Sequence, residues 1–135
     1  MFDTKIAIMV LEDLETWQKL NIAAFLASGI AAGAPQAMGE PYRDAQGREY
    51  AALIGQPIMI LSATREVLLR ARNQALQRDL LRAAYVRAMF QTGHDAANRE
   101  VFEAEDADLP DLVGLAVRGP RKDIDKATKG ARLHG

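Results

Sequence analysis

The sequence predicts a single α/β domain, a three-layer sandwich in which helices cover both faces of a four-stranded mixed or parallel sheet. Four short apolar runs lack polar alternation, which is typical of strands buried on both faces. Segments with helical periodicity separate these runs, and that alternation is typical of α/β folds. The length of 135 residues suits one hydrophobic core, so residues 1–135 are predicted to form one domain.

The first strand is predicted over residues 5–11, where Lys-Ile-Ala-Ile-Met-Val-Leu is almost entirely apolar. A helix follows, with Thr16 as its expected N-cap, and Gly33 and Pro35 end it. Apolar residues cover nearly all sides of this helix, which indicates that it is buried. Its many alanines allow a close approach to the sheet.

Residues 33–55 are rich in glycine and proline and are predicted to be irregular. Within them, Asp44-Ala-Gln-Gly47 is a turn signal between Tyr42 and Tyr50, which favours a small hairpin. A loop of this length suits a mobile flap, although plain surface loops of similar length also occur.

The second half of the chain repeats the alternation of strands and helices. A proline at the start of the second strand is tolerated there, and Pro120 suits the first turn of the last helix. The predicted elements are a strand over 56–61, a helix capped by Ser62 or Thr64 and reaching about Arg82, a strand over 84–90, an acidic loop over 95–111, a strand over 113–117, and a helix from Pro120 to near Gly130.

The composition narrows the classes of function. The net charge of −1 provides no general case for nucleic-acid or membrane binding. The absence of cysteine excludes disulfides and thiolate chemistry, and with only two histidines we predict neither a metal site nor a cofactor. The N-terminus lacks the pattern of a signal peptide, and the apolar stretch from Leu20 to Ala32 is too short to span a bilayer. We therefore expect a cytoplasmic protein.

Several motifs, in shared order and spacing, resemble those of the type II peptidyl-tRNA hydrolase superfamily. They are Lys19-Leu-Asn-Ile-Ala-Ala24, Gly55-Gln56-Pro57, Asp95-Ala96-Ala97, Gly119-Pro120 and Ile124-Asp-Lys-Ala-Thr-Lys-Gly130. The chain is most similar to the uncharacterised bacterial branch of that superfamily, a domain of unknown function. The resemblance implies a peptidyl-tRNA hydrolase II-like fold.

The polar residues of those hydrolases are mostly replaced in this chain. Asn21 stands where a second lysine is usual, Phe25 where a glutamine is usual, and Arg99 where a threonine is usual. Ser28 or Gly29 takes the place of a helical histidine. Only Lys19 and Asp95 align with the hydrolase cluster, so the resemblance implies no assigned reaction.

Lys19 and Asp95 are the first candidate site residues, because both follow the carboxyl ends of predicted strands, where α/β sheets bind ligands. A lysine ammonium there could hold an anion or polarise a carbonyl, and a nearby aspartate would orient it. His94 is a candidate general base beside Asp95. Each of these residues could equally be an ordinary exposed or capping side chain. Asn21, Thr92 and Trp17 are predicted to line the same pocket.

Three functions follow from these candidates. The first is binding of a small anionic or carbonyl-bearing ligand near Lys19 and Asp95. The second is hydrolysis of peptidyl- or aminoacyl-tRNA esters by Lys19, His94 and Asp95, which turnover of a charged tRNA would reveal. In that case tRNA would be a partner, although the arginines of residues 65–82 are equally typical of a solvated helix. The third is a homodimer formed through residues 6–11 or 42–50.

Overall fold

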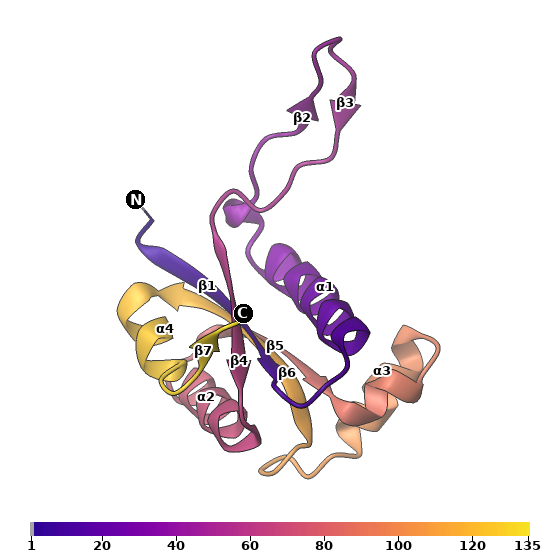
Figure 1. Ribbon diagram of the computed structural model, residues 1–135, viewed down its shortest axis with the longest axis vertical. Helices are drawn as coiled ribbons and strands as arrows, with labels where there is room; N and C mark the ends of the chain where they lie inside the picture. Colours follow the sequence, from indigo (N-terminus) through magenta and orange to yellow (C-terminus); the bar gives the residue numbers. More distant parts are fainter. Residues whose placement is uncertain (1) are drawn as a thin grey trace.

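A computed structural model of the protein describes residues 2–135 and shows a five-stranded sheet with helices on both faces (Figure 1). The strands, in the order in which they lie side by side, are β5 (Leu81–Val86), β6 (Leu112–Pro120), β1 (Thr4–Leu11), β4 (Ile58–Ala63) and β7 (Arg132–Leu133). Of these pairs, β1 and β4 are parallel and the other three are antiparallel. The predicted α/β class and mixed sheet are confirmed.

Four α-helices accompany the sheet. Helix α1 (Thr16–Gly33) packs against β5, β6 and β1 on one face, whereas α2 (Arg65–Gln77) and α4 (Arg121–Ala127) pack on the other face. Helix α3 (Asp95–Glu103) contacts the short 3-10 helix η2 (Arg87–Gln91) that follows β5. Each face of the central strands is therefore covered, which explains why these strands lack polar alternation.

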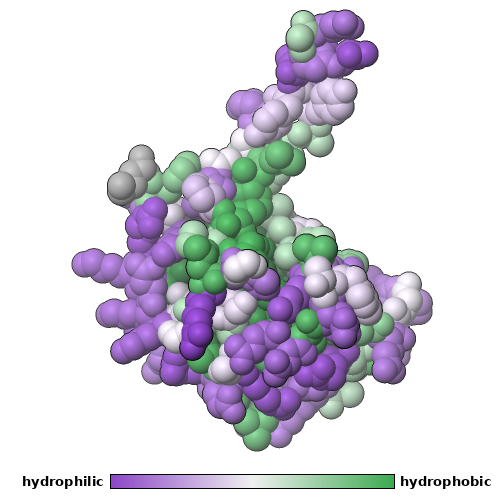
Figure 2. All heavy atoms as spheres, viewed as in Figure 1, coloured by the Kyte–Doolittle hydropathy of each residue, from purple (hydrophilic) through white to green (hydrophobic). Residues whose placement is uncertain are grey.

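The predicted hairpin is present, and it projects from the body as an arm, which we define as residues 38–54 (Figure 1). After the 3-10 helix η1 (Pro35–Ala37), strands β2 (Tyr42–Arg43) and β3 (Glu49–Tyr50) pair with each other. The tip of the arm is hydrophilic and its foot is hydrophobic (Figure 2).

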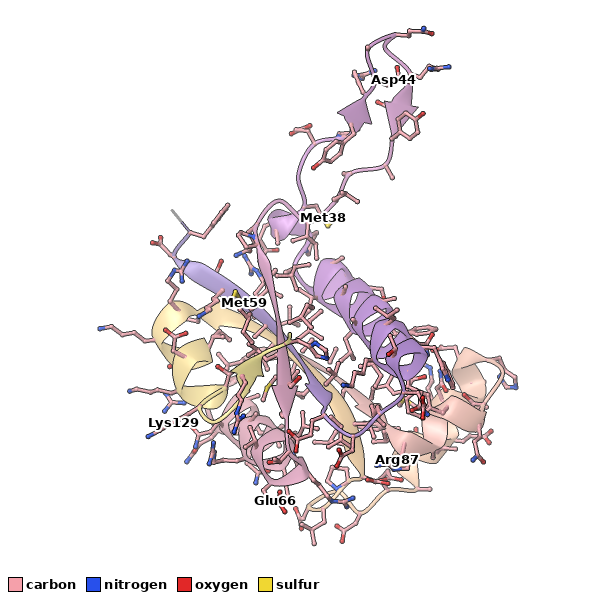
Figure 3. The ribbon with its side chains drawn as sticks, in the orientation of Figure 1. Met38, Asp44, Met59, Glu66, Arg87 and Lys129 are labelled. Atoms are coloured by element: carbon pink, nitrogen blue, oxygen red, sulfur yellow. The ribbon has the colours of Figure 1, made fainter. Side chains whose placement is uncertain are left out.

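Asp44 organises the turn at the tip of the arm, far from Met38 at its foot (Figure 3). One carboxylate oxygen of Asp44 accepts from the backbone N–H groups of Gln46 and Arg48, at 2.9 and 3.0 Å. The Arg48 side chain donates to the other oxygen at 2.7 Å, and this bond is the main cause that lowers the pKa of Asp44. Gly47 has φ of +81°, a conformation that a side chain disfavours.

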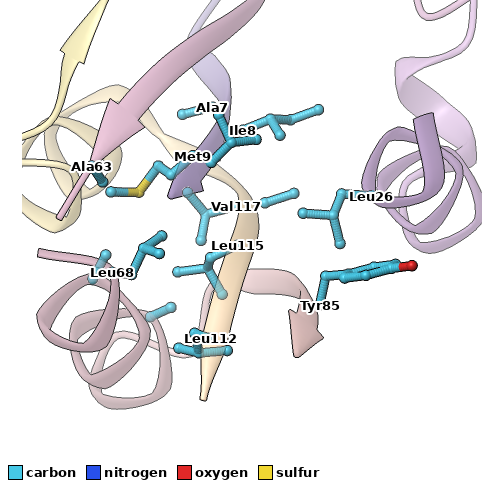
Figure 4. Close-up of a cluster of buried hydrophobic side chains, with 14 of the residues drawn as sticks. Ala7, Ile8, Met9, Leu26, Ala63, Leu68, Tyr85, Leu112, Leu115 and Val117 are labelled. Carbon is cyan, nitrogen blue, oxygen red and sulfur yellow. The ribbon is translucent and has the colours of Figure 1, made fainter. Parts of the chain in front are cut away.

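The hydrophobic core lies on both sides of β1 (Figure 4). In the register with β6, Ile8 pairs with Ala116 and Met9 pairs with Leu115. Ile8 points towards α1, whereas Leu115 points towards Leu68 of α2 (Figure 4). Residues alternate between two buried faces along a strand, so one apolar run supplies both halves of the core.

Three predicted boundaries in the first two helices and the third strand need correction. Helix α1 is preceded by Glu15, not Thr16, as its N-cap, because Glu15 and Gln18 form a reciprocal capping box. Helix α2 ends at Gln77, not near Arg82, because Asp79 turns the chain with φ of +51°. The third strand consequently starts earlier, at Leu81, and residues 87–91 form η2 instead of continuing it.

Two elements that we did not predict complete the fold. The sheet has five strands, not four, because the last residues of the chain return as β7 beside β4. A strand of two residues is too short to show a period in the sequence. The predicted acidic loop over 95–111 begins as helix α3, whose acidic and apolar residues lie on separate faces. The last helix is shorter than predicted and ends at Ala127.

Candidate functional site

A cavity of about 310 Å³ lies between the start of α1, the end of β5 with η2, and the start of α3. These three elements are far apart in the sequence but adjacent at one edge of the sheet (Figure 1). Aromatic rings and a methionine form its apolar walls, and side chains that can form hydrogen bonds surround them. The lining residues are Trp17, Asn21, Phe25, Tyr85, Met89, Phe90, Thr92, Gly93, His94, Asp95 and Asn98.

The four aromatic rings of the cavity contact one another in series. The ring centroids of Trp17 and Phe90 are 5.8 Å apart in an edge-to-face arrangement. Tyr85 lies 5.2 Å from Phe90 and 6.1 Å from Phe25, both tilted. Each such pair stabilises the fold by about 0.5–1.5 kcal/mol, in addition to the free energy gained by burying the apolar area of the rings. The result is a pre-formed apolar wall against which a flat group could pack.

Tyr85 places a phenol group within this wall. The residue is buried, and its side chain lies on the α1 face of the sheet because Tyr85 pairs with Gly114 in the antiparallel register. The Asn21 amide nitrogen donates to the Tyr85 oxygen at 3.2 Å. The phenol therefore accepts from Asn21 and retains its own O–H as a donor. Burial raises the pKa of Tyr85 above its ordinary value of 10.0.

This pKa shift predicts a specific loss of stability in alkaline solution. Above pH 10.0 the unfolded chain releases the Tyr85 proton while the folded chain retains it, so the unfolded state binds fewer protons and unfolding becomes more favourable. The contribution of Tyr85 is complete below pH 10.0 and is lost as the pH rises. Urea titrations from pH 8 to 11 should show a steeper loss for wild type than for Tyr85→Phe; equal slopes would contradict the prediction.

His94 and Thr92 position the loop between η2 and α3. The Nδ1 atom of His94 accepts the backbone N–H of Ala97 at 3.2 Å, so the imidazole caps α3. In a neutral ring, an accepting Nδ1 leaves the hydrogen on Nε2 as a donor. The Thr92 hydroxyl bonds to the Met89 carbonyl oxygen at 3.0 Å and to the Asn98 side chain. These bonds hold the polar rim of the cavity in place.

Asp95 lies on the rim of the cavity, where it pairs with Arg99 one helical turn away. The carboxylate and guanidinium groups are 2.8 Å apart and both are mostly exposed, so this ion pair adds about 0–1 kcal/mol to stability. Arg99 lines a second hollow of about 300 Å³, which shares five residues with the first: Phe25, Tyr85, Met89, Asp95 and Asn98. The two hollows therefore adjoin each other along one side of α1.

Five of the six predicted site residues line this cavity: Trp17, Asn21, Thr92, His94 and Asp95. Lys19 is not among the lining residues. Its Nζ instead lies 3.4 Å from Nε2 of His134, beside β7. Asn21 is two residues from Lys19, so their side chains leave α1 in very different directions. Within residues 2–135, no hydrogen bond or ion pair connects Lys19, His94 and Asp95 with one another.

Sequence reasoning missed the aromatic half of the cavity. From the sequence, Phe25 is expected on a buried face of the first helix, and Tyr85 and Phe90 are expected in one continuous strand. The signal in the sequence was the pair Trp17 and Phe25, two large aromatic residues on a helix that is otherwise mostly aliphatic. Both are more than half exposed, which marks an interaction surface and not a core.

The described part of the chain contains no candidate metal site. Among residues 2–135, no three histidine, aspartate or glutamate side chains come close enough to hold a metal ion.

A membrane-spanning helix requires both sufficient length and an apolar composition, and none of the helices within residues 2–135 has both.

Comparisons with known proteins identify relatives without an assigned activity. A solved structure described as a protein of unknown function from Agrobacterium tumefaciens is similar, with 49% sequence identity, a TM-score of 0.95 and complete coverage of both chains. No curated protein matches the chain. The peptidyl-tRNA hydrolase resemblance stays a prediction, because neither match names that superfamily. A model of a family of proteins of unknown function, DUF2000, matches residues 4–135, and the chain therefore belongs to the DUF2000 family.

Proposed function

We propose that the cavity between α1, η2 and α3 binds a small planar molecule that carries a carbonyl group. The observation that supports this proposal best is the combination of a wall of four aromatic rings with two available hydrogen-bond donors, the Tyr85 O–H and the His94 Nε2–H. A volume of about 310 Å³ is at the lower end of ligand sites, which commonly span about 300–1,000 Å³.

A carbonyl is favoured over an anion because of the charges around the cavity. Asp95, the one acidic side chain among the lining residues, pairs with Arg99, which lines the adjoining hollow. No lysine and no other arginine lines either hollow. A neutral acceptor such as an amide or aldehyde oxygen would satisfy the donors without bringing a second negative charge near Asp95. An anionic ligand near Lys19 would have to occupy a different place, beside His134.

Trp17 makes the proposal directly testable. It is the single tryptophan of the chain and lines the cavity, so its emission reports occupancy without a label. Benzamide should change the emission in a saturable way and raise the melting temperature, whereas benzyl alcohol, which has the ring but no carbonyl, should bind more weakly. If neither benzamide nor a wider panel of planar amides and aldehydes alters emission or melting, the proposal fails.

Replacing Tyr85 by phenylalanine should weaken benzamide binding while keeping the aromatic wall. Loss of one hydrogen bond costs about 0.5–1.5 kcal/mol, which corresponds to a roughly two- to tenfold higher Kd. Tyr42→Phe on the arm removes an exposed phenol far from the cavity and serves as the matched control. Titrations that follow Trp17 emission should separate the two variants, and an equal Kd for both would exclude Tyr85 as a donor to the ligand.

Ester hydrolysis of peptidyl- or aminoacyl-tRNA stays a prediction of the sequence resemblance. It would require Lys19 to act with His94 and Asp95, and Lys19 lies against His134 instead. The geometry therefore supports small-molecule binding better than this reaction.

A further inference from the structure

We propose that the arm, residues 38–54, joins two copies of the chain into a two-fold dimer. In this dimer each arm lies along the apolar groove that α1, the foot of the arm and Ile58 of β4 form in the other copy. No residue lines both this groove and the ligand cavity, although Ser28 lines the groove and also the second hollow beside the cavity.

The foot of the arm packs on the body, where Ile54 contacts the hydrophobic core, but the strands of the arm do not join the five-stranded sheet. Within residues 2–135, strands β2 and β3 pair only with each other, and one further bridge, between Met38 and Ile54, closes the foot. An isolated two-stranded hairpin is marginally stable in water. Tyr42 and Tyr50 form a cross-strand pair, yet they are 56% and 59% exposed. An arm with unburied tyrosines is typical of a segment that packs against a partner.

A matching groove lies at the foot of the arm. Its volume is about 450 Å³, and apolar atoms line it almost throughout. The lining residues are Ala27, Ser28, Ala31, Met38, Ala52, Leu53, Ile54 and Ile58. Figure 2 shows hydrophobic side chains gathered at the foot of the arm and on the body directly below it.

The groove continues along the surface of α1. Leu20 and Ala24 precede Ala27 and Ala31 at helical spacing, so the four side chains form one stripe, and Leu20 is 66% exposed. Strand β4 also keeps most of its side chains only half-buried, although it lies between β1 and β7. The apolar surface available to a partner is therefore larger than the groove alone.

A second copy is the partner that this arrangement fits best. Arm and groove meet at the same edge of one chain, so a two-fold axis near the foot would place each arm on the other groove, which makes the contact self-complementary. Four of the five charged side chains on the arm, all but Glu40, are already paired, Arg43 with Glu49 at 3.0 Å and Arg48 with Asp44 at 2.7 Å. The arm can therefore dock without leaving these charges unpaired.

The available area is close to what a stable dimer needs. The exposed parts of Tyr42, Tyr50, Leu53 and Leu20 amount to roughly 500 Å² per copy, given that an aromatic side chain buries about 150–250 Å². A two-fold contact doubles this area to about 1,000 Å², before any backbone or alanine surface is counted, and specific interfaces begin near 1,200 Å².

The test measures the solution mass of the intact protein by light scattering at micromolar concentration. Wild type should have twice the chain mass of 14.8 kDa. Leu53→Glu places a charge on the groove and should yield a monomer. Leu109→Glu is the matched control, because Leu109 is 61% exposed, much like Leu53 at 60%, but lies on the loop after α3, and it should remain a dimer. A monomeric wild type overturns the proposal.

A second variant tests whether a monomeric Leu53→Glu results from loss of the contact and not from misfolding. Replacing residues 40–52 by two glycines joins Gly39 to Leu53, whose backbone N–H and carbonyl groups are already 2.8 Å apart. This clipped chain should be a monomer with wild-type circular dichroism and unchanged Trp17 emission. A clipped chain that remains dimeric would overturn the proposal, as would dissociation of Leu109→Glu to the same extent as Leu53→Glu.

Discussion

Leu115→Ala should lower the free energy of unfolding by about 2–5 kcal/mol, the largest effect that we expect from a single truncation. Leu115 is fully buried at the centre of β6 and contacts the core between the sheet and α2 (Figure 4). The substitution removes apolar contacts and also leaves a cavity, because the strands β1 and β5 on either side of β6 prevent the site from collapsing.

Urea denaturation followed by circular dichroism measures this loss as a lower midpoint at an unchanged slope. Leu109→Ala is the control, since Leu109 is mostly exposed and its truncation should change stability by less than about 0.5 kcal/mol. If Leu115→Ala is no more destabilised than the control, the proposed packing of α2 on β6 is wrong.

Gly114→Ala should destabilise the protein by about 1–3 kcal/mol through the opposite mechanism, overpacking. A Cβ atom at Gly114 would collide with Ile22 of α1, and it would lie 3.1 Å from Cδ1 of Leu26 and 3.5 Å from the carbonyl oxygen of Met9. The missing side chain is thus what allows α1 to approach β6 closely. A methyl group in that position has to push α1 away from the sheet.

Displacement of α1 should also be visible at the cavity, because α1 carries Trp17 and Asn21. We expect Gly114→Ala to shift the Trp17 emission and to lower the urea midpoint together. Gly135→Ala is the control for the same chemical change, because an added Cβ there meets no atom within 4 Å and Gly135 is not among the residues that line the cavity. Comparable destabilisation of both variants would show that helix–sheet contact is not the reason that residue 114 is glycine.

The alternation of apolar runs and amphipathic segments was sufficient to predict most of the fold. The strand over residues 5–11 and the helix ending at Gly33 appear close to where the sequence places them. Such elements are predictable because burial of a whole strand or helix face is recorded in many residues at once. The hairpin between Tyr42 and Tyr50 was also predictable, because turn residues are a local signal.

Elements that depend on one or two residues were not predictable. The left-handed turn at Asp79 ends α2 without the glycine that usually marks such a site. Strand β7 has only two residues, and it forms because its backbone pairs with the edge of β4. Helix α3 was not predicted because it lies within a strongly acidic segment and because its N-cap, His94, is not a common capping residue.

The candidate site likewise has one part that the sequence predicts and another part that it does not. The sequence predicts that the start of the first helix and the segment after the third strand meet at one edge of the sheet. Five predicted residues from these segments line one cavity: Trp17, Asn21, Thr92, His94 and Asp95. The rotation of α1 against the sheet directs Lys19 towards His134, and the packing of β5 beside η2 adds Tyr85 and Phe90 to the aromatic wall. The physical reason is that a sequence specifies which residues share a helix or strand, whereas the direction of each side chain depends on how that element is rotated against its neighbours.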